Sequence, residues 1–457
     1  MKPDKIYQGE ITRFDQKGRG IFDLTLPNLE TRPMAVPFVF PGDKIEAQYA
    51  GRKLGVYAGR LNKIISPSPE RVAPPLPDLN QYPGAPWLCL DYPAQLAYKR
   101  DMINQAFTAT GHTEKIDSVE SCPELYYYRN RMDYSYGWRG ELGLRQLGFW
   151  HKYFNVTHDI LLSPEATPIL EVCRGLTARF NVVPWDHKRN CGDLRYVVIR
   201  EGKFTHERLI ALIIKDLTKI SVPARDYLKT TLGQYATSLI LGENSLITDS
   251  SYAQKIEILK GQEYFTENIN GLNYKIHLNS FFQTNSLMAS RLQKTVAQLI
   301  NDRTQDVGRR TINHLLDLYC GLGFFGIYLA KQNPGLKIRG FEIDAPAIEL
   351  AKQNSLMNNV GAQCSFAAGP VEDLSWQNIE TDLVIIDPPR AGLHPTVLAA
   401  LLKKQPRTII YVSCNYHRLA AELKEFKKTY KVTALQALDL FPHTPHVEVV
   451  VRLDRQT

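Results

Sequence analysis

Cys414 has the setting that best fits a reactive side chain in this 457-residue sequence. The chain has seven cysteines, and a cysteine inside an apolar run normally packs as a small hydrophobic residue. Cys414 instead lies between Ser413 and Asn415, directly after the apolar run 409–412, where we expect a β-strand to end. A thiol at a strand end, among small polar residues, is placed to act as a nucleophile.

A nucleophilic thiol that adds to a ring needs a base, which removes a proton before the thiol can leave. Glu448 is our candidate, because a carboxylate suits proton abstraction and Glu448 comes just before the apolar run 449–453. His443 and His446 are alternatives, either as the base or as residues that hold the loop. The spacing along the sequence does not choose between the three.

A glycine-bearing turn at residues 317–326 follows the apolar run 315–318 and opens into a helical stretch at 327–331. Glycines let the backbone approach a ligand closely, and a helix N-terminus offers unpaired N–H groups. The next apolar run ends at Glu342, where a carboxylate can accept hydrogen bonds from both hydroxyl groups of a ribose. Methyltransferases and NAD-dependent enzymes share these two features, so both classes stay open at this point.

The loop Asp387-Pro-Pro-Arg390, which follows the apolar run 383–386, favours a methyltransferase. Consecutive prolines fix a rigid loop, from which Asp387 and Arg390 would project at the mouth of the site. A simple strand-to-helix connection is the alternative, but it does not call for Asp and Arg on either side of a proline pair. Gln283 lies upstream, before a predicted helix at 286–300, and taken alone it would be read as part of a helix start.

The elements that position these residues alternate between β-type apolar runs and helical stretches. The predicted strands cover residues 315–318, 337–341, 383–386 and 408–412. This alternation predicts a parallel sheet with helices on both faces and with ligands bound at the carboxyl ends of the strands. Residues 271–457 are therefore predicted to form a Rossmann-like α/β domain.

Residues 1–65 are predicted to form a small β-barrel at the front of the chain. This segment holds 11 basic and 7 acidic residues, a net charge of +4, which is half of the +8 of the whole chain. Clustered Lys and Arg suit contact with an RNA backbone, although a solvated barrel rim would look the same. The β-type runs, broken by glycine and proline, are Tyr7–Phe14, Gly18–Leu26, Met34–Phe40, Lys44–Tyr49 and Leu54–Ile65.

Residues 66–270 are predicted to hold a proline-rich strap and a central α+β domain. Seven prolines between residues 66 and 86 disfavour regular structure and mark a boundary, and a helix is predicted at 93–110. Aromatic residues and arginines then interleave from Tyr126 to Arg139, which suits stacking on RNA bases and contacts with phosphates. A half-buried strand would show the same alternation.

The composition, 44% apolar and 22% charged, is that of a globular protein. The sequence has no apolar run of about 18 residues, the length that a membrane helix needs, and no secretory signal. It has no Cys-x-x-Cys pair, which argues against a disulfide framework or a zinc site. We expect a cytoplasmic monomer without a bound metal ion or a membrane segment.

In combination, these motifs resemble the RNA 5-methyluridine (uracil-C5) methyltransferase family, whose members depend on S-adenosylmethionine. The match covers residues 271–457, and the order of the motifs agrees with the family: Phe282-Gln283-Thr284-Asn285, Asp317-Leu-Tyr319-Cys-Gly321, Glu342, Asp387-Pro-Pro-Arg390, Ser413-Cys414-Asn415 and His446-Val-Glu448. The resemblance implies that Cys414 adds to C6 of a uridine and that Glu448 takes the proton from C5. The predicted cofactor contacts are Gln283, Tyr319, Gly321, Gly323, Glu342 and Asp387, and the predicted substrate contacts are Arg390 and Asn415.

The front of the chain also resembles family members. Pro41-Gly42-Asp43 is similar to the TRAM domain, an oligonucleotide-binding barrel, and Tyr128-Arg-Asn-Arg131 resembles the start of the central RNA-binding region. Many relatives hold a four-iron, four-sulfur cluster through cysteines before the motif that matches residues 91–96, whereas here only Cys89 is nearby, so we predict no cluster. Phe324 stands where several relatives carry a polar cofactor contact.

Two other functions stay open on the sequence. One is a methyltransferase that acts on a different RNA base, and the other is a catalytically silent RNA-binding or folding factor. Cys414 argues against methylation of an amino group, which needs no thiol, and the sequence around it lacks the Pro-Cys motif of cytosine-C5 enzymes. The intact set of Cys414, Glu448 and cofactor motifs weighs against a silent factor. The TRAM-like front favours 23S ribosomal RNA as the partner, with transfer RNA next.

Overall fold

The computed structural model describes residues 5–25, 30–53, 55–147, 151–301 and 312–456. Leu26 and Leu54, each at an end of a predicted strand, lie outside these residues. The chain divides into two compact units. The first comprises Met1–Met102, Gln146–Trp150 and Phe441–His446, and the second comprises Ile103–Arg145, His151–Leu440 and Val447–Thr457.

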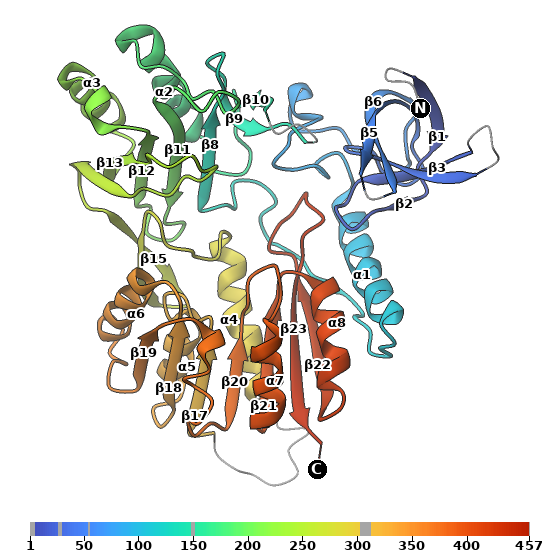
Figure 1. The fold of residues 1–457 in the computed structure, drawn as a ribbon, viewed down its shortest axis with the longest axis vertical. Helices are drawn as coiled ribbons and strands as arrows, with labels where there is room; N and C mark the ends of the chain where they lie inside the picture. Colours follow the sequence, from blue (N-terminus) through green and yellow to red (C-terminus); the bar gives the residue numbers. More distant parts are fainter. Residues whose placement is uncertain (1–4, 26–29, 54, 148–150, 302–311, 457) are drawn as a thin grey trace. The chain divides into compact units, whose positions relative to one another are not determined.

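The first unit contains a six-stranded sheet that is rolled into a small barrel (Figure 1). Its strands are β1 (Ile6–Glu10), β2 (Arg13–Phe14), β3 (Gly20–Thr25), β4 (Thr31–Val36), β5 (Lys44–Lys53) and β6 (Val56–Ser66), in the order β1-β5-β6-β4-β3-β2. Alternate residues of these strands point inward, and Phe22, Met34, Val36 and Ile45 form the buried core. The front of the chain therefore folds as the predicted barrel, but the run Met34–Phe40 is a strand only as far as Val36, and the run Tyr7–Phe14 is divided between β1 and β2.

Asp43 ties the barrel to the proline-rich strap within the first unit. Its carboxylate is fully buried and accepts hydrogen bonds from the backbone N–H groups of Phe40 at 2.7 Å and Ser68 at 2.8 Å. Arg71 in the strap pairs with the same carboxylate at 2.6 Å. The strap continues through a 3-10 turn (Pro77–Leu79) into α1 (Tyr92–Ala109), so the predicted helix is confirmed.

The second unit contains a central seven-stranded sheet with the order β10-β9-β8-β11-β12-β13-β14. The strands are β8 (Arg131–Tyr136), β9 (Leu142–Arg145), β10 (Tyr153–Asn155), β11 (Leu194–Glu201), β12 (Arg208–Ile214), β13 (Ser238–Glu243) and β14 (Lys255–Lys260). Helices α2 (Ala166–Phe180) and α3 (Val222–Leu232) pack against each other beside it. A separate hairpin, β15 (Tyr264–Ile269) and β16 (Leu272–His277), leads on to the last sheet.

The last sheet has eight strands in the order β19-β18-β17-β20-β21-β23-β22-β7. β23 runs antiparallel to both of its neighbours, and the remaining pairs are parallel. The strands are β7 (Val119–Glu120), β17 (His314–Leu318), β18 (Lys337–Glu342), β19 (Cys364–Ala368), β20 (Leu383–Ile386), β21 (Thr408–Ser413), β22 (Tyr430–Leu438) and β23 (Glu448–Arg455). The order, with its reversal between β17 and β20, is that of a doubly wound sheet, which confirms the predicted Rossmann-like class.

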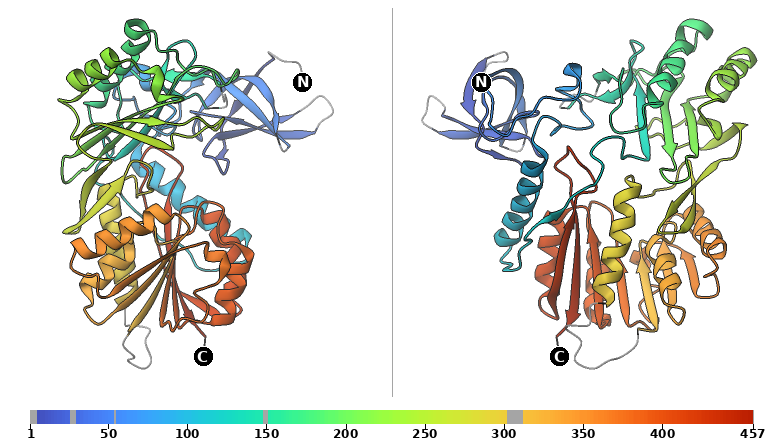
Figure 2. Two further views of the ribbon diagram at one scale, coloured as in Figure 1. Left: turned by 60° about the vertical axis from the view of Figure 1, so that its left-hand side comes forward. Right: turned by 180° about the vertical axis from the view of Figure 1, so that it is seen from behind.

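Helices cover both faces of this sheet, as Figure 2 shows. α4 (Ser286–Asn301), α5 (Phe324–Gln332) and α6 (Ala345–Met357) lie on one face, and α7 (Pro395–Lys404) and α8 (Tyr416–Phe426) lie on the other. Among the described residues, no helix combines the length and the apolar character needed to cross a membrane.

Candidate active site at the carboxyl edge of the sheet

Cys414 directly follows β21, and Glu448 is the first residue of the neighbouring strand β23. β21 and β23 pair antiparallel, and their last register pair at this edge is Ser413 with Val449, the residues next to Cys414 and Glu448 in the sequence. The two side chains are close enough that the Glu448 carboxylate raises the pKa of the Cys414 thiol. The structure therefore brings together the predicted nucleophile and the predicted base.

The environment of Cys414 disfavours its thiolate in the free protein. Burial, followed by smaller contributions from Glu448 and Asp387, raises the pKa of the thiol to about 11, and Arg390 acts in the opposite direction. Cys414 nevertheless keeps part of its surface exposed, and that access is what a nucleophile requires. A positive charge that approaches the site would favour the thiolate.

Glu448 is 3% exposed, and burial together with the Asp387 carboxylate raises its pKa well above the usual value. Arg390 acts in the opposite direction. A carboxylate with a raised pKa is a stronger base than an exposed one, because protonation relieves its poor solvation. The site thus gives Glu448 the property that abstraction of a proton from carbon requires.

Asn415 and Arg390, the predicted substrate contacts, are joined to each other. The Asn415 amide donates to the carbonyl oxygen of Arg390 at 2.9 Å, and its side-chain oxygen caps helix α8 by accepting from the Arg418 N–H. The Arg390 side chain is exposed at the loop that follows β20. Asn415 therefore links the loop after β20 to the loop after β21.

The glycine turn after β17 has the strained backbone of a ligand-binding loop. Tyr319, Gly321 and Gly323 have φ angles of 62°, 53° and 79°, in the left-handed region. A Cβ at Gly321 would meet no heavy atom within 4 Å, so the space beside it is open, whereas a Cβ at Gly323 would lie 2.8 Å from the side chain of Ile327. Gly321 fits a close approach by a ligand, and Gly323 fits close packing against helix α5.

Three carboxylates gather at this edge, namely Asp317, Glu342 and Asp387. Asp317 is 1% exposed; its Oδ2 accepts from the Gly326 N–H at 3.1 Å, while Oδ1 has no hydrogen-bond partner within the described residues. Burial, with a smaller contribution from Glu342, raises the pKa of Asp317 to about 7. Burial and the other two carboxylates raise the pKa of Asp387 as well.

Glu342, at the end of β18, has capacity for a ligand. Its two carboxylate oxygens accept from the N–H groups of Gly321 at 3.2 Å and Asp344 at 3.1 Å. A carboxylate has about four lone-pair positions, so two remain for hydroxyl groups such as those of a ribose. The open space at Gly321, the unpartnered oxygen of Asp317 and the surplus of negative charge together fit a nucleoside that carries positive charge, as S-adenosylmethionine does.

Phe324, the first residue of α5, packs against Tyr274 of the hairpin and against Phe282, which precedes Gln283 in the sequence. Gln283 is 7% exposed, and its backbone carbonyl is held by Asn130 at 2.8 Å. Phe324 is buried and packs edge-on against Phe282 with ring centroids 5.7 Å apart. Phe324 is therefore part of an apolar ring cluster, and its side chain offers no polar contact to a cofactor.

His443 and His446 belong to the first unit, whereas Cys414 and Glu448 belong to the second. His443 is 4% exposed, and its Nδ1 lies 3.1 Å from the Gln95 amide. Burial, with a smaller contribution from Lys99, lowers the pKa of His443 to about 4. These contacts give His443 a structural role within the first unit, and His446 is exposed.

Two features of the site were missed by sequence reasoning. Asp317 was noted only as the start of the glycine turn, although its position as an acidic residue inside an apolar strand was a usable signal. Asn130 was noted only within a segment that resembles an RNA-binding region, and no local pattern links it to Gln283, 153 positions away. No group of three or more His, Cys, Asp or Glu side chains in the described part of the chain could hold a metal ion.

The fold and the site define a class I methyltransferase, and comparisons with known proteins give its family. The family model described as tRNA (Uracil-5-)-methyltransferase matches residues 243–456. A tRNA (uracil(54)-C(5))-methyltransferase of Pyrococcus horikoshii is 34% identical over 92% of this chain and 95% of that protein. A 23S rRNA (uracil(747)-C(5))-methyltransferase of the same organism is 29% identical over 98% of this chain and 99% of that protein.

A solved structure agrees over almost the whole chain. It is the Pyrococcus abyssi tRNA (uracil-54, C5)-methyltransferase in complex with S-adenosyl-L-homocysteine. The two chains are 30% identical and superpose with a TM-score of 0.77. The match covers 98% of this chain and 100% of that one. The chain therefore belongs to the RNA uracil-C5 methyltransferase family. It is an S-adenosylmethionine-dependent enzyme that acts on RNA, as the motifs predicted.

The carboxylate cluster predicts how cofactor affinity depends on pH. Ionised Asp317 and Asp387 attract a cation, and both have raised pKa values, so binding of a cation releases protons. Affinity for S-adenosylmethionine should therefore rise by about fivefold to tenfold as the pH is raised from about 6 to about 8. S-adenosylhomocysteine lacks the sulfonium charge, so its affinity should rise less over the same pH range. Calorimetric titration of both ligands tests this, and equal pH dependence of the two would refute the role of the cluster.

Proposed function

We propose that the chain methylates C5 of a uridine in structured RNA through a covalent bond between Cys414 and C6 of the base. The observation that supports this proposal is the pairing of β21 with β23, whose last pair, Ser413 with Val449, adjoins Cys414 and Glu448, together with the effect of the Glu448 carboxylate on the pKa of Cys414. A methyltransferase that acts on an amino group would need no thiol at this position. A catalytically silent RNA-binding protein would need neither residue.

The chemistry of the chain's own residues can be followed atom by atom. The Cys414 thiolate forms a bond from Sγ to C6, and the electrons of the C5–C6 double bond make C5 nucleophilic. S-adenosylmethionine, when bound, supplies the methyl group that C5 takes up. Glu448 then removes the proton from C5, the double bond re-forms, and the bond from Sγ to C6 breaks. Arg390, whose charge lowers the pKa of both Cys414 and Glu448, favours the ionised forms that the two steps require.

We propose that six residues hold the cofactor: Gln283, Tyr319, Gly321, Gly323, Glu342 and Asp387. Glu342 would accept hydrogen bonds from the ribose hydroxyls, and Gly321 leaves room for the ligand beside the backbone. Asp387 and the neighbouring Asp317 would stabilise positive charge on the cofactor. Arg390 and Asn415 would face the RNA, since their two loops are joined and Arg390 is exposed.

We propose three functional regions, with RNA bound by residues 1–65 and 66–270 and methyl transfer carried out by residues 271–457. Support in the central region comes from exposed aromatic residues: Tyr126 is 36% exposed, Tyr127 is 45% exposed, and Trp138 is 49% exposed with the Arg139 guanidinium 4.7 Å from its ring centroid. Such side chains stack on unpaired bases. Since one chain supplies every residue of the site, we propose that the protein acts as a monomer.

Transfer RNA is the substrate that we propose, with 23S ribosomal RNA as the second candidate. The preference for ribosomal RNA rested on the front barrel, but the tRNA (uracil-54) enzyme of known structure is matched over 98% of this chain, so the barrel does not separate the two. Relatives named for uracil 54 of tRNA are 32–34% identical to this chain, compared with 29–31% for those named for uracil 747 of 23S rRNA.

Labelled methyl transfer to the two RNA types tests this choice. A tRNA transcript is expected to accept one methyl group per molecule, and a 23S rRNA fragment is expected to accept little. A T-loop uridine replaced by cytidine serves as the matched control and should abolish the signal. Methylation of the ribosomal fragment alone would contradict the proposal for tRNA and leave the site chemistry in place.

We propose that the chain carries no iron–sulfur cluster. A cluster of this type needs four thiolate ligands, and the region before residue 91 has only Cys89, which is 4% exposed. The strap is held instead by the Asp43 contacts with Ser68 and Arg71. The purified protein is expected to contain no iron by elemental analysis and to show no cluster absorption. Stoichiometric iron bound to the chain would contradict this.

A further inference from the structure

Asn130 joins the central sheet to the segment that carries Gln283. It is 1% exposed and directly precedes β8, and its amide donates to the Gln283 carbonyl at 2.8 Å and to the Ser286 hydroxyl at 2.9 Å. Its backbone N–H donates to the Thr284 carbonyl at 2.8 Å. Both acceptors of the side chain are oxygens, so the amide nitrogen must face them.

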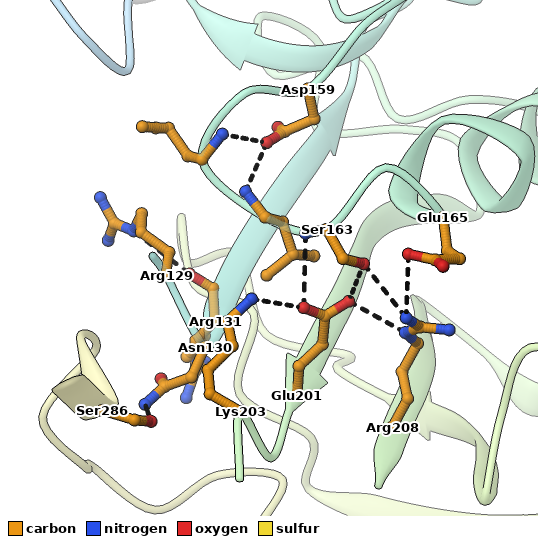
Figure 3. A network of polar contacts seen from close by, with 12 residues as sticks. Arg129, Asn130, Arg131, Asp159, Ser163, Glu165, Glu201, Lys203, Arg208 and Ser286 are labelled. Atoms are coloured by element: carbon orange, nitrogen blue, oxygen red, sulfur yellow. Dashed lines mark hydrogen bonds and ion pairs between the residues drawn. The ribbon is translucent and has the colours of Figure 1, made fainter. Parts of the chain in front are cut away.

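The backbone of Asn130 is itself fixed by strand β11. The Glu201 N–H donates to the Asn130 carbonyl at 2.8 Å. The Glu201 carboxylate, 4% exposed, accepts from Lys203 at 2.7 Å, from Arg208 at 2.9 Å and from the Ser163 hydroxyl. Figure 3 shows Asn130 beside Ser286, with Glu201 at the centre of the neighbouring cluster of charged side chains.

The preceding residue of β11, Arg200, holds the start of the same segment. Arg200 is fully buried, and its guanidinium donates to the carbonyl groups of His277 at 2.6 Å, Leu278 at 3.1 Å and Ser280 at 2.8 Å. Arg200 therefore fixes residues 277–280 through hydrogen bonds to their backbone, and Asn130 fixes residues 283–286 through hydrogen bonds of its own. The central sheet fixes both ends of the segment in which Gln283 lies.

We infer that Asn130 is a positioning residue for cofactor binding, which acts by fixing the backbone of Gln283. The inference rests on the proposed function in so far as Gln283 contacts S-adenosylmethionine. It also changes how the segment 128–131 is understood. Tyr128, like Asn130, is 1% exposed and thus closed to an RNA base, whereas Tyr126 and Tyr127 are exposed; within this segment Asn130 holds the backbone of Gln283.

Asn130→Asp tests the inference, because it keeps the shape of the side chain and removes the amide donor. The Kd for S-adenosylhomocysteine, measured by calorimetry without RNA, is expected to rise about tenfold, since two hydrogen bonds are lost and a carboxylate faces the Gln283 carbonyl. The KM for S-adenosylmethionine should rise by the same factor, while kcat at saturating cofactor should change by less than about twofold.

Asn244→Asp is the matched control. Asn244 is also 1% exposed, and its amide donates to a backbone carbonyl, that of Ser250, at 2.9 Å, but it contacts no part of the cofactor loop. We expect Asn244→Asp to lose about as much thermal stability as Asn130→Asp. Its Kd for the cofactor should nevertheless stay within about twofold of the wild-type value. Asn130→Ser, which adds no charge, provides a second variant if Asn130→Asp does not fold.

The outcomes separate the inference from the proposed function. Cofactor affinity that is unchanged in a folded Asn130 variant, or that falls equally in the Asn244 control, would overturn the inference. Gln283→Ala is measured alongside. If this variant binds the cofactor as tightly as the wild type does, the proposed contact of Gln283 is wrong. If Gln283→Ala binds the cofactor weakly and Asn130→Asp binds it with wild-type affinity, only the positioning role of Asn130 is rejected.

Discussion

Cys414→Ala is expected to lower the rate of methyl transfer to RNA by at least about 10⁴-fold, because the thiol is the group that makes C5 nucleophilic. Uracil C5 has little tendency to take a methyl group while the ring remains conjugated. The alanine variant should bind the cofactor normally, since no proposed cofactor contact involves Cys414. Methyl incorporation from labelled S-adenosylmethionine into tRNA measures the loss.

Cys364→Ala is the matched control for this change. Cys364 begins β19 in the same sheet and is also partly exposed, but β19 runs parallel to its neighbour, so its first residue lies at the amino edge, away from the site. Its rate should stay within about threefold of the wild-type rate, as is usual for substitutions outside the active site. Activity of Cys414→Ala comparable to that of this control would contradict the covalent mechanism.

Glu448→Gln is expected to separate the two halves of the reaction. The amide has the shape of the carboxylate but cannot take the C5 proton, so the methylated adduct should form and then persist. Resolution should slow by about 10²- to 10⁴-fold, the usual contribution of general base catalysis. Denaturing electrophoresis with labelled cofactor should therefore show labelled RNA attached to the protein.

A second buried carboxylate provides the control for Glu448→Gln. Glu422 on α8 also has a pKa raised by burial, and it accepts a hydrogen bond from Tyr411. Glu422→Gln should lose some stability but release its product at nearly the wild-type rate. Accumulation of adduct in both variants, or in neither, would remove Glu448 from the role of base.

The strand ends that carry the site could be predicted because buried parallel strands have continuous apolar sequences. β20 is Leu-Val-Ile-Ile and is completely buried, so its end at Asp387 was evident. β19 and β22 were not predicted, because each has exposed positions among its residues, as expected for a strand at or near the edge of a sheet. A chemically important residue is thus most visible where it interrupts an apolar run.

Relations between distant residues could not be predicted. Glu448 was proposed as the base for Cys414 on its residue type and on the family resemblance, whereas the pairing of β21 with β23 that brings their strand ends together is not visible in the spacing. The link between Asn130 and Gln283 likewise depends on how the central sheet packs against the hairpin segment, and no local sequence pattern encodes it. His443 shows that a residue close to a reactive motif in the sequence need not take part in the site. Its side chain is buried, and its ring nitrogen contacts the Gln95 amide.

The most direct test of the account is to locate the bond between protein and RNA. Wild-type enzyme is incubated with cofactor and tRNA that contains 5-fluorouridine, whose C5 has no proton for Glu448 to remove, so the adduct should survive denaturation. After digestion, mass spectrometry should find the modified nucleotide on the peptide that contains Cys414. Attachment to another residue, or methylated product without any adduct, would contradict the central claim that Cys414 is the nucleophile.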